Sequence, residues 1–202
     1  MKKLLLFPIC LFALKAAYGQ HYADSIYKHR EHYRNEFVTD ERSPLGMRDT
    51  SYLRFYAPDK TYRVTASLKL TPEASPFQIP THSGKTKTYR KYGILHFLIK
   101  GKPYDLEVYQ SLDLIKKEEY KNHLFVPFND LTNYEETYGG GRYIDLSITD
   151  IIDNTILLDF NKCYNPYCAY AEGYNCPIPP EANRLSIPIK AGEKTFGKKI
   201  EE

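Results

Sequence analysis

Three cysteines near the C-terminal end of the chain have the side chains best suited to covalent or metal chemistry. Cys163, Cys168 and Cys176 follow a C-x4-C-x7-C spacing. In an oxidising compartment a disulfide is the default, and a bond from Cys168 to Cys176 would close a short loop. Zinc held by all three is a weaker alternative, because a fourth ligand is lacking and no histidine follows His123. Free thiols are the third alternative, and the odd number leaves one thiol unpaired or paired between chains.

A glycine-rich stretch supplies the second candidate site. Residues 130–143 read DLTNYEETYGGGRY, so three glycines directly precede Arg142. Backbone amides and a guanidinium fork can cradle an anion. The stretch leads into a strand, however, and lacks the helix dipole that strengthens phosphate loops. The alternatives are a loop whose glycines need positive φ, and an ion pair between Arg142 and Asp130, Glu135 or Glu136. The same carboxylates are more typical of solvated charge than of an acid/base pair.

The histidines indicate no catalytic site. His29 and His32 are three residues apart on an expected helix, where a solvated polar face is favoured over a metal site. His96 lies within an apolar stretch. No G-x-S-x-G, H-E-x-x-H or G-x-x-x-x-G-K-[ST] motif occurs.

The first nineteen residues are typical of a signal peptide. Lys2 and Lys3 precede an apolar stretch, Leu4 to Leu14, and Ala17-Tyr18-Gly19 fits a cleavage site. We therefore expect a mature chain of residues 20–202, exported to the periplasm or secreted, with no membrane span after cleavage.

The charge balance argues against a nucleic-acid partner. The chain has 28 Lys and Arg against 25 Asp and Glu, and residues 1–19 contain three of the lysines and no acid. The mature chain then has 25 of each sign, so no basic excess is left for nucleic acid or for a membrane surface.

The elements that must position these groups are mostly strands. Apolar spacing predicts one amphipathic helix from Tyr22 to Phe37. Alternation predicts strands around residues 62–70, 104–108 and 144–148, and apolar runs predict others at 93–99, 124–128, 155–160 and 185–189. Residues 93–99 and 104–108 are expected to form a hairpin. The chain is therefore predicted to be a single mainly β domain, with its core at about residues 43–190, folded as an antiparallel barrel or sandwich with one N-terminal helix. Residues 191–202 are expected to be frayed.

Three blocks of sequence resemble a known family. The first block contains DFN at 159–161, YNP at 164–166, CAY at 168–170, CP at 176–177, PP at 179–180, NRL at 183–185 and AGEK at 191–194. The second contains LFVPF at 124–128, Asp130, Thr132, TY at 137–138 and GRY at 141–143, and the third contains YRV at 62–64 with SPL at 43–45. Together they resemble domain-of-unknown-function family 1684, for which no activity, substrate or cofactor is implied. The resemblance implies that Cys168 and Cys176 are the family's pair and that Cys163 is the odd cysteine.

Polar residues within these blocks are the ligand-binding candidates. They are Asp130, Thr137, Tyr138, Arg142, Asn161, Asn165 and Asn183. If the blocks meet in space, these residues would line a polar pocket beside the cysteines. The alternative is a hydrogen-bonded structural core.

Three functions are compatible with these residues. The favoured hypothesis is a non-enzymatic binding module for a small polar or anionic ligand near Arg142, with no cofactor. The second is a metal- or thiol-dependent hydrolase-like enzyme that uses the cysteine loop with Asp130 and Arg142. The third is a structural envelope protein whose tyrosine-rich face contacts a partner. None of them predicts a particular oligomeric state.

Overall fold

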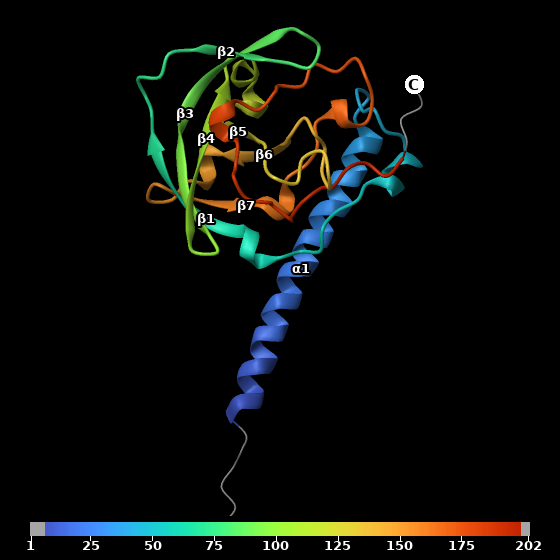
Figure 1. The fold of residues 1–202 in the computed structure, drawn as a ribbon, viewed down its shortest axis with the longest axis vertical. Helices are drawn as coiled ribbons and strands as arrows, with labels where there is room; N and C mark the ends of the chain where they lie inside the picture. The colour runs from blue at the N-terminus through green and yellow to red at the C-terminus, as the bar shows by residue number, and fades with distance from the viewer. Residues whose placement is uncertain (1–6, 199–202) are drawn as a thin grey trace, which may run out of the picture.

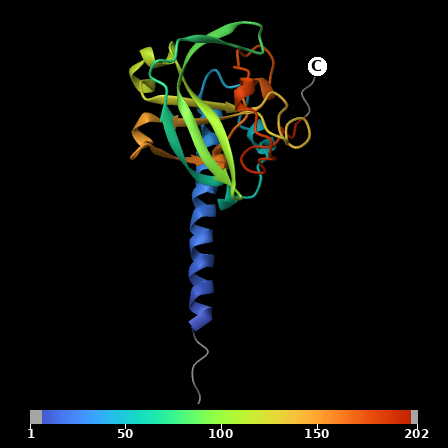
Figure 2. The ribbon, with the colours of Figure 1, turned by 60° about the vertical axis from the view of Figure 1, so that its left-hand side comes forward.

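One long helix stands beside a curved sheet in the computed structural model, which describes residues 7–198. Helix α1 runs from Phe7 to Thr39 and contains the helix expected at Tyr22–Phe37. Its first half projects away from the body of the molecule and its second half lies against the sheet (Figure 1, Figure 2). Among the described residues α1 is the only α-helix, and the other helical segments are 3₁₀ turns.

The signal-peptide prediction falls partly on residues without a described structure. Lys2 and Lys3, its positive start, lie outside the described residues. Within residues 7–198, no helix has both the length and the apolar character needed to span a membrane.

Within the described residues, seven strands form one antiparallel sheet. They are β1 (Arg63–Leu70), β2 (Phe77–Pro80), β3 (Thr86–Ile99), β4 (Lys102–Ser111), β5 (His123–Phe128), β6 (Arg142–Ser147) and β7 (Thr155–Asp159). The order is β6-β5-β4-β3-β1-β7, and β2 pairs with β3 beside this path. The sheet curls into a half-barrel, so β6 and β7 are its two open ends (Figure 1). The expected mainly antiparallel fold with one N-terminal helix is confirmed.

Period-two alternation located several strands correctly. On β1, Ala66 and Leu68 are buried while their neighbours Thr65 and Ser67 are exposed. The expected hairpin is also present, since β3 and β4 pair from Tyr89↔Ser111 to Ile99↔Lys102. Its two-residue connection adopts positive φ at both positions, 51° and 75°, as hairpin turns require.

Two expectations at the C-terminal end are wrong. Residues 185–189 form no strand, because Pro188 has no N–H to donate and only an isolated bridge joins Asn129 to neighbouring Arg184. Within the described part of the expected frayed tail, residues 191–193 are buried. Ala191 and Glu193 are completely buried. This segment is ordered by hydrogen bonds to Arg142, which the sequence pattern does not reveal.

The interior of the half-barrel is the main hydrophobic core. Leu106 and Val108 of β4, Val126 of β5 and Leu158 of β7 are all completely buried in one cluster. Phe160 closes the same cluster and packs edge-on against Phe128. Apolar burial of this kind is the dominant stabilising force of a small domain.

Polar contacts attach α1 to the body. The Tyr33 hydroxyl donates to the Glu193 carboxylate at 3.0 Å and lies 3.0 Å from the Tyr170 hydroxyl. Nearer the N-terminus of α1, the Tyr22 hydroxyl donates to the Asp159 carboxylate at 3.0 Å. Phe37 is buried beside Tyr170 with perpendicular rings. These contacts fix which side of α1 faces the open ends of the sheet.

Candidate functional site: the cleft between helix α1 and the sheet ends

Arg142, the favoured ligand-binding residue, is completely enclosed. It begins β6, and its side chain has no exposed surface. One terminal nitrogen donates to Asp130 at 2.6 Å and to the Ile189 carbonyl at 2.9 Å. The other donates to the carbonyls of Ala191 at 2.6 Å and Glu193 at 3.1 Å. Protein groups thus occupy both ends of the guanidinium fork, which fastens residues 189–193 to the sheet.

Asp130 and Thr137 belong to the same buried network. The second Asp130 oxygen accepts from the Ile189 amide at 3.0 Å and from the Thr132 hydroxyl at 2.6 Å. Thr137 lies 2.8 Å from the Thr132 hydroxyl, oxygen to oxygen. These oxygens of Asp130, Thr132 and Thr137 thus have hydrogen-bond partners within the protein. The arrangement matches the alternative of a hydrogen-bonded structural core.

The three candidate asparagines each hold a different loop. The Asn183 amide donates to the carbonyls of Glu107 and Pro127 at 2.8 and 2.7 Å. The Asn161 amide donates to the Asp59 carbonyl, and the Asn165 amide to the Lys194 carbonyl.

Among these asparagines, only Asn165 reaches the Arg142 network. Its backbone N–H donates to the Glu193 carboxylate at 2.9 Å, and the Glu193 carbonyl accepts from Arg142. Tyr138 is partly buried, and its ring packs against His82. The contacts of these candidates are therefore distributed over several loops.

Of the three glycines before Arg142, one has a backbone conformation that requires glycine. Gly141 has φ of 88°, and a Cβ there would stand 2.7 Å from the Phe128 carbonyl oxygen. Gly139 and Gly140 have no positive φ. The stretch thus agrees at Gly141 with the alternative of a loop that requires glycine.

Cys168 and Cys176 lie at disulfide distance, with their Cα atoms 6.3 Å apart. Cys163 is a buried free thiol 3.6 Å from the Ala191 carbonyl. Burial raises the pKa of Cys163 to about 11, so it is protonated at neutral pH. Within residues 7–198, no three or more His, Cys, Asp or Glu side chains are grouped so as to hold a metal ion.

Glu193 is a functional candidate that the sequence analysis missed. Its carboxylate is completely buried and accepts hydrogen bonds from Tyr33, Tyr170 and Asn165. Burial raises the pKa of Glu193 to about 7. Only its place in the AGEK block could have drawn attention to it.

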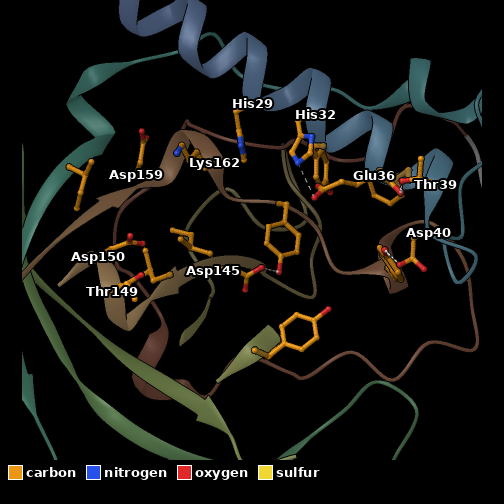
Figure 3. Close-up of a pocket in the computed structure, with 18 of the residues that line it drawn as sticks. His29, His32, Glu36, Thr39, Asp40, Asp145, Thr149, Asp150, Asp159 and Lys162 are labelled. Carbon is orange, nitrogen blue, oxygen red and sulfur yellow. Dashed lines mark hydrogen bonds and ion pairs between the residues drawn. The ribbon is translucent and has the colours of Figure 1, made fainter. Parts of the chain in front are cut away.

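A further cavity lies between α1 and the open ends of the sheet. We call it the α1 cleft, and its volume is about 1060 Å³. Its charged and imidazole side chains are His29, His32, Glu36, Asp40, Arg42, Asp145, Asp150, Asp159 and Lys162. Its aromatic side chains are Tyr33, Phe37, Tyr120, Tyr164 and Tyr167. Figure 3 shows α1 crossing above it, with Asp145 near its centre.

Three elements bring these side chains together. Helix α1 presents His29, His32 and Glu36, which recur at three- and four-residue intervals and so share one face. Strand β6 contributes Asp145, and β7 contributes Leu157. His29 and His32, which were expected on a solvated face, thus border this cleft.

Asp145 is held in place at the centre of the α1 cleft. One carboxylate oxygen accepts from the Tyr164 hydroxyl at 2.7 Å, and the other lies 3.0 Å from His123 Nε2. The side chain nevertheless remains 46% exposed. Burial and the Asp145 carboxylate raise the pKa of Tyr164 well above its usual range, so its hydroxyl stays a donor.

The electrostatic character of the α1 cleft is acidic. Five carboxylates line it against one lysine and one arginine. Burial, and then the charge of Lys162, lower the pKa of His29, which therefore stays neutral near pH 7. Asp150 has no hydrogen-bond or ion-pair partner in the described part of the chain. The cleft can accordingly bind through hydrogen bonds, carboxylate charge and tyrosine rings.

Fold and burial pattern define a class of protein: an antiparallel half-barrel with a helix across its open side. The chain belongs to the family described as "Protein of unknown function (DUF1684)", whose model matches residues 49–194. The family expected from the sequence blocks is confirmed.

A solved relative shares this fold. It is an uncharacterized protein of Haloarcula marismortui, determined by solution NMR. The two chains are 30% identical with a TM-score of 0.66, and the match covers 88% of this chain and 96% of that one. No curated protein matches the chain.

Proposed function

We propose that this protein is a non-catalytic binding module and that its ligand occupies the α1 cleft. One observation carries the proposal: a cavity of about 1060 Å³ is lined by polar and aromatic side chains from α1, β6 and β7. Ligand sites of small molecules typically measure about 300–1,000 Å³ and contain a few oriented polar groups. Asp145, fixed by Tyr164 and His123 yet half exposed, is such a group.

The neighbourhood of Arg142, favoured from the sequence, supports the proposal less well. Its guanidinium is used by Asp130 and by three backbone carbonyls, so a ligand would have to displace the chain's own groups. Leaving the buried Asp130 carboxylate unpaired would be costly. We therefore place the binding site at Asp145 instead of Arg142.

Amide shift mapping tests the site. Isotope-labelled protein of residues 20–202 would be titrated with cationic spermidine, anionic citrate, neutral maltose and short peptides. Ligand binding in the α1 cleft is expected to shift amides of α1, β6 and β7, and Asp150→Lys is expected to change the affinity. Saturable shifts centred on residues 130–142, or no shift in the cleft with any probe, would overturn the proposal.

We also propose that residues 1–19 are removed and that the protein works in the periplasm or outside the cell. The cysteine pair at disulfide distance supports this location, because disulfides persist in oxidising compartments. N-terminal sequencing of the protein from a periplasmic extract is expected to begin at Gln20. An intact N-terminus in the cytoplasmic fraction would contradict the proposal.

A further inference from the structure

The outer edge of β6 has unpaired backbone groups. Tyr143 exchanges two backbone hydrogen bonds with Tyr164, at 2.9 and 3.0 Å, on the side away from β5. Opposite Tyr143 on β5 is Pro127, which has no N–H, in agreement with this direction. Because bonding direction alternates along a strand, the next residue that points outward is Asp145. No group in the described part of the chain bonds to its backbone N–H or C=O.

The outer edge of β7 is open in the same way. The Leu68 amide donates to the Asn154 carbonyl at 2.8 Å, so alternation directs Ile156 toward β1. Thr155 accordingly bonds away from β1, to Ile152. Leu157 must point away as well, and its backbone groups have no partner among the described residues. Its side chain is 44% exposed, so this edge is accessible.

Both open edges border the α1 cleft. Asp145 and Leu157 line it together, although β6 and β7 are opposite ends of the sheet order. An added strand could therefore bond to either edge and extend the half-barrel. Five extended residues span about 17 Å, which matches the length of β7.

From these observations we infer that the occupant of the α1 cleft is an extended peptide with lysine or arginine side chains, bound by strand addition. Main-chain hydrogen bonds supply affinity in this binding mode, and pockets for alternate side chains supply specificity. The carboxylates of Asp145 and Asp150 complement cationic side chains, and the rings of Tyr120 and Tyr164 can stack on them. The inference rests on the proposed function and specifies its ligand class.

Fluorescence anisotropy tests the inference on protein of residues 20–202. The probe is a labelled hexapeptide in which lysine alternates with valine or threonine. One control peptide replaces lysine with glutamate, and another places proline at every second position, which removes backbone donors. The basic peptide is expected to bind at least tenfold more tightly than either control, and more weakly as salt rises.

Two matched variants locate the binding. Asp150→Lys reverses an unpaired charge of the α1 cleft and is expected to weaken peptide binding about tenfold. Asp113→Lys changes an exposed carboxylate that does not line the cleft and is expected to leave the affinity unchanged. Circular dichroism of both variants would confirm that the fold is retained.

The outcomes separate this inference from the proposed function. If spermidine shifts the cleft amides but the basic peptide binds no better than the acidic or proline peptide, the strand-addition inference is wrong and the proposed function stands. If no polar probe binds in the cleft, both are wrong. Equal loss of binding in Asp150→Lys and Asp113→Lys would also overturn the inference.

Discussion

At the residue scale, a side chain's partners decide whether it is available for binding. Arg142 and Asp145 both lie on β6, three residues apart. Arg142 is fully buried and hydrogen-bonded by its own chain, whereas Asp145 keeps 46% of its side chain exposed. The arginine therefore stabilises the fold, and the aspartate is the better contact for a ligand.

Replacing Arg142 should test its structural role. Arg142→Met would leave the Asp130 carboxylate buried and unpaired, and we expect it to lower the free energy of unfolding by about 3–5 kcal/mol. The double variant Arg142→Met/Asp130→Asn should lose less than the sum of the two single variants. Urea unfolding measures both. Arg184→Met, which breaks an exposed pair with Glu181, should cost at most about 1 kcal/mol.

Glu193 should make stability depend on pH. Its pKa is raised from the ordinary value near 4.5 to about 7 by burial. The folded state then binds more protons than the unfolded state between these values, so stability falls as pH rises from about 4.5 to 7. The fall from this group is expected to be about 3 kcal/mol and then to level off.

The matched variants for this prediction are Glu193→Gln and Glu136→Gln. Urea unfolding from pH 5 to 8 should lose the downward slope in Glu193→Gln. Glu136 has a lowered pKa because Lys190 bonds to it, so its replacement should leave the slope between pH 5 and 8 intact. An unchanged slope in Glu193→Gln would show that another group is responsible.

At the element scale, residues 163–193 form no regular strand, and separate side-chain links attach them to the rest of the molecule. The cysteine pair closes a short loop, Asn183 holds a 3₁₀ turn against β4 and β5, and Arg142 binds residues 189–193. Such a segment depends on specific links because it lacks the ladder of a sheet.

Removing the cysteine pair should therefore destabilise the protein. Cys168→Ala/Cys176→Ala is expected to lower the free energy of unfolding by about 2.5 kcal/mol, from the entropy of a short closed loop. Cys163→Ala leaves the pair intact and serves as the control. Equal unfolding curves for the wild-type protein under oxidising and reducing conditions would contradict this prediction.

Local patterns anticipate the strands better than they anticipate the site. Alternation at residues 62–70 and 104–108 follows directly from one buried face, so both strands could be predicted. Residues 185–189 look equally apolar, yet Pro188 and the tether from Arg142 keep them irregular.

The α1 cleft could not be predicted because its parts are distant in sequence. His32 on α1 and Asp145 on β6 are separated by more than a hundred residues, and only the curl of the sheet places both at one cavity. Arg142 attracted attention because arginine often binds anions, but its burial depends on carbonyls near residue 190 that no local pattern identifies. In the sequence, the polar residues Asp145 and Ser147 alternate with apolar ones, and this alternation was the signal that one face of β6 is accessible.

At the scale of the whole molecule, the half-barrel is open between β6 and β7, the two ends of its strand order. Helix α1 crosses the open side, attached through Tyr33 to Glu193 and through Tyr22 to Asp159 (Figure 1). The sheet ends beneath it have free backbone groups at Asp145 and Leu157. The molecule thus combines a buried core with two sheet edges that have free backbone groups.

Amide hydrogen exchange at Asp145 and Leu157 tests this account most directly. Both amides are expected to exchange rapidly in the free protein, because neither donates to another described group. Saturating basic hexapeptide should slow exchange at one or both, while amides of residues 130–142 keep their rates. Unchanged exchange at both edges, with protection appearing around Arg142, would contradict the central claim that ligand binds in the α1 cleft.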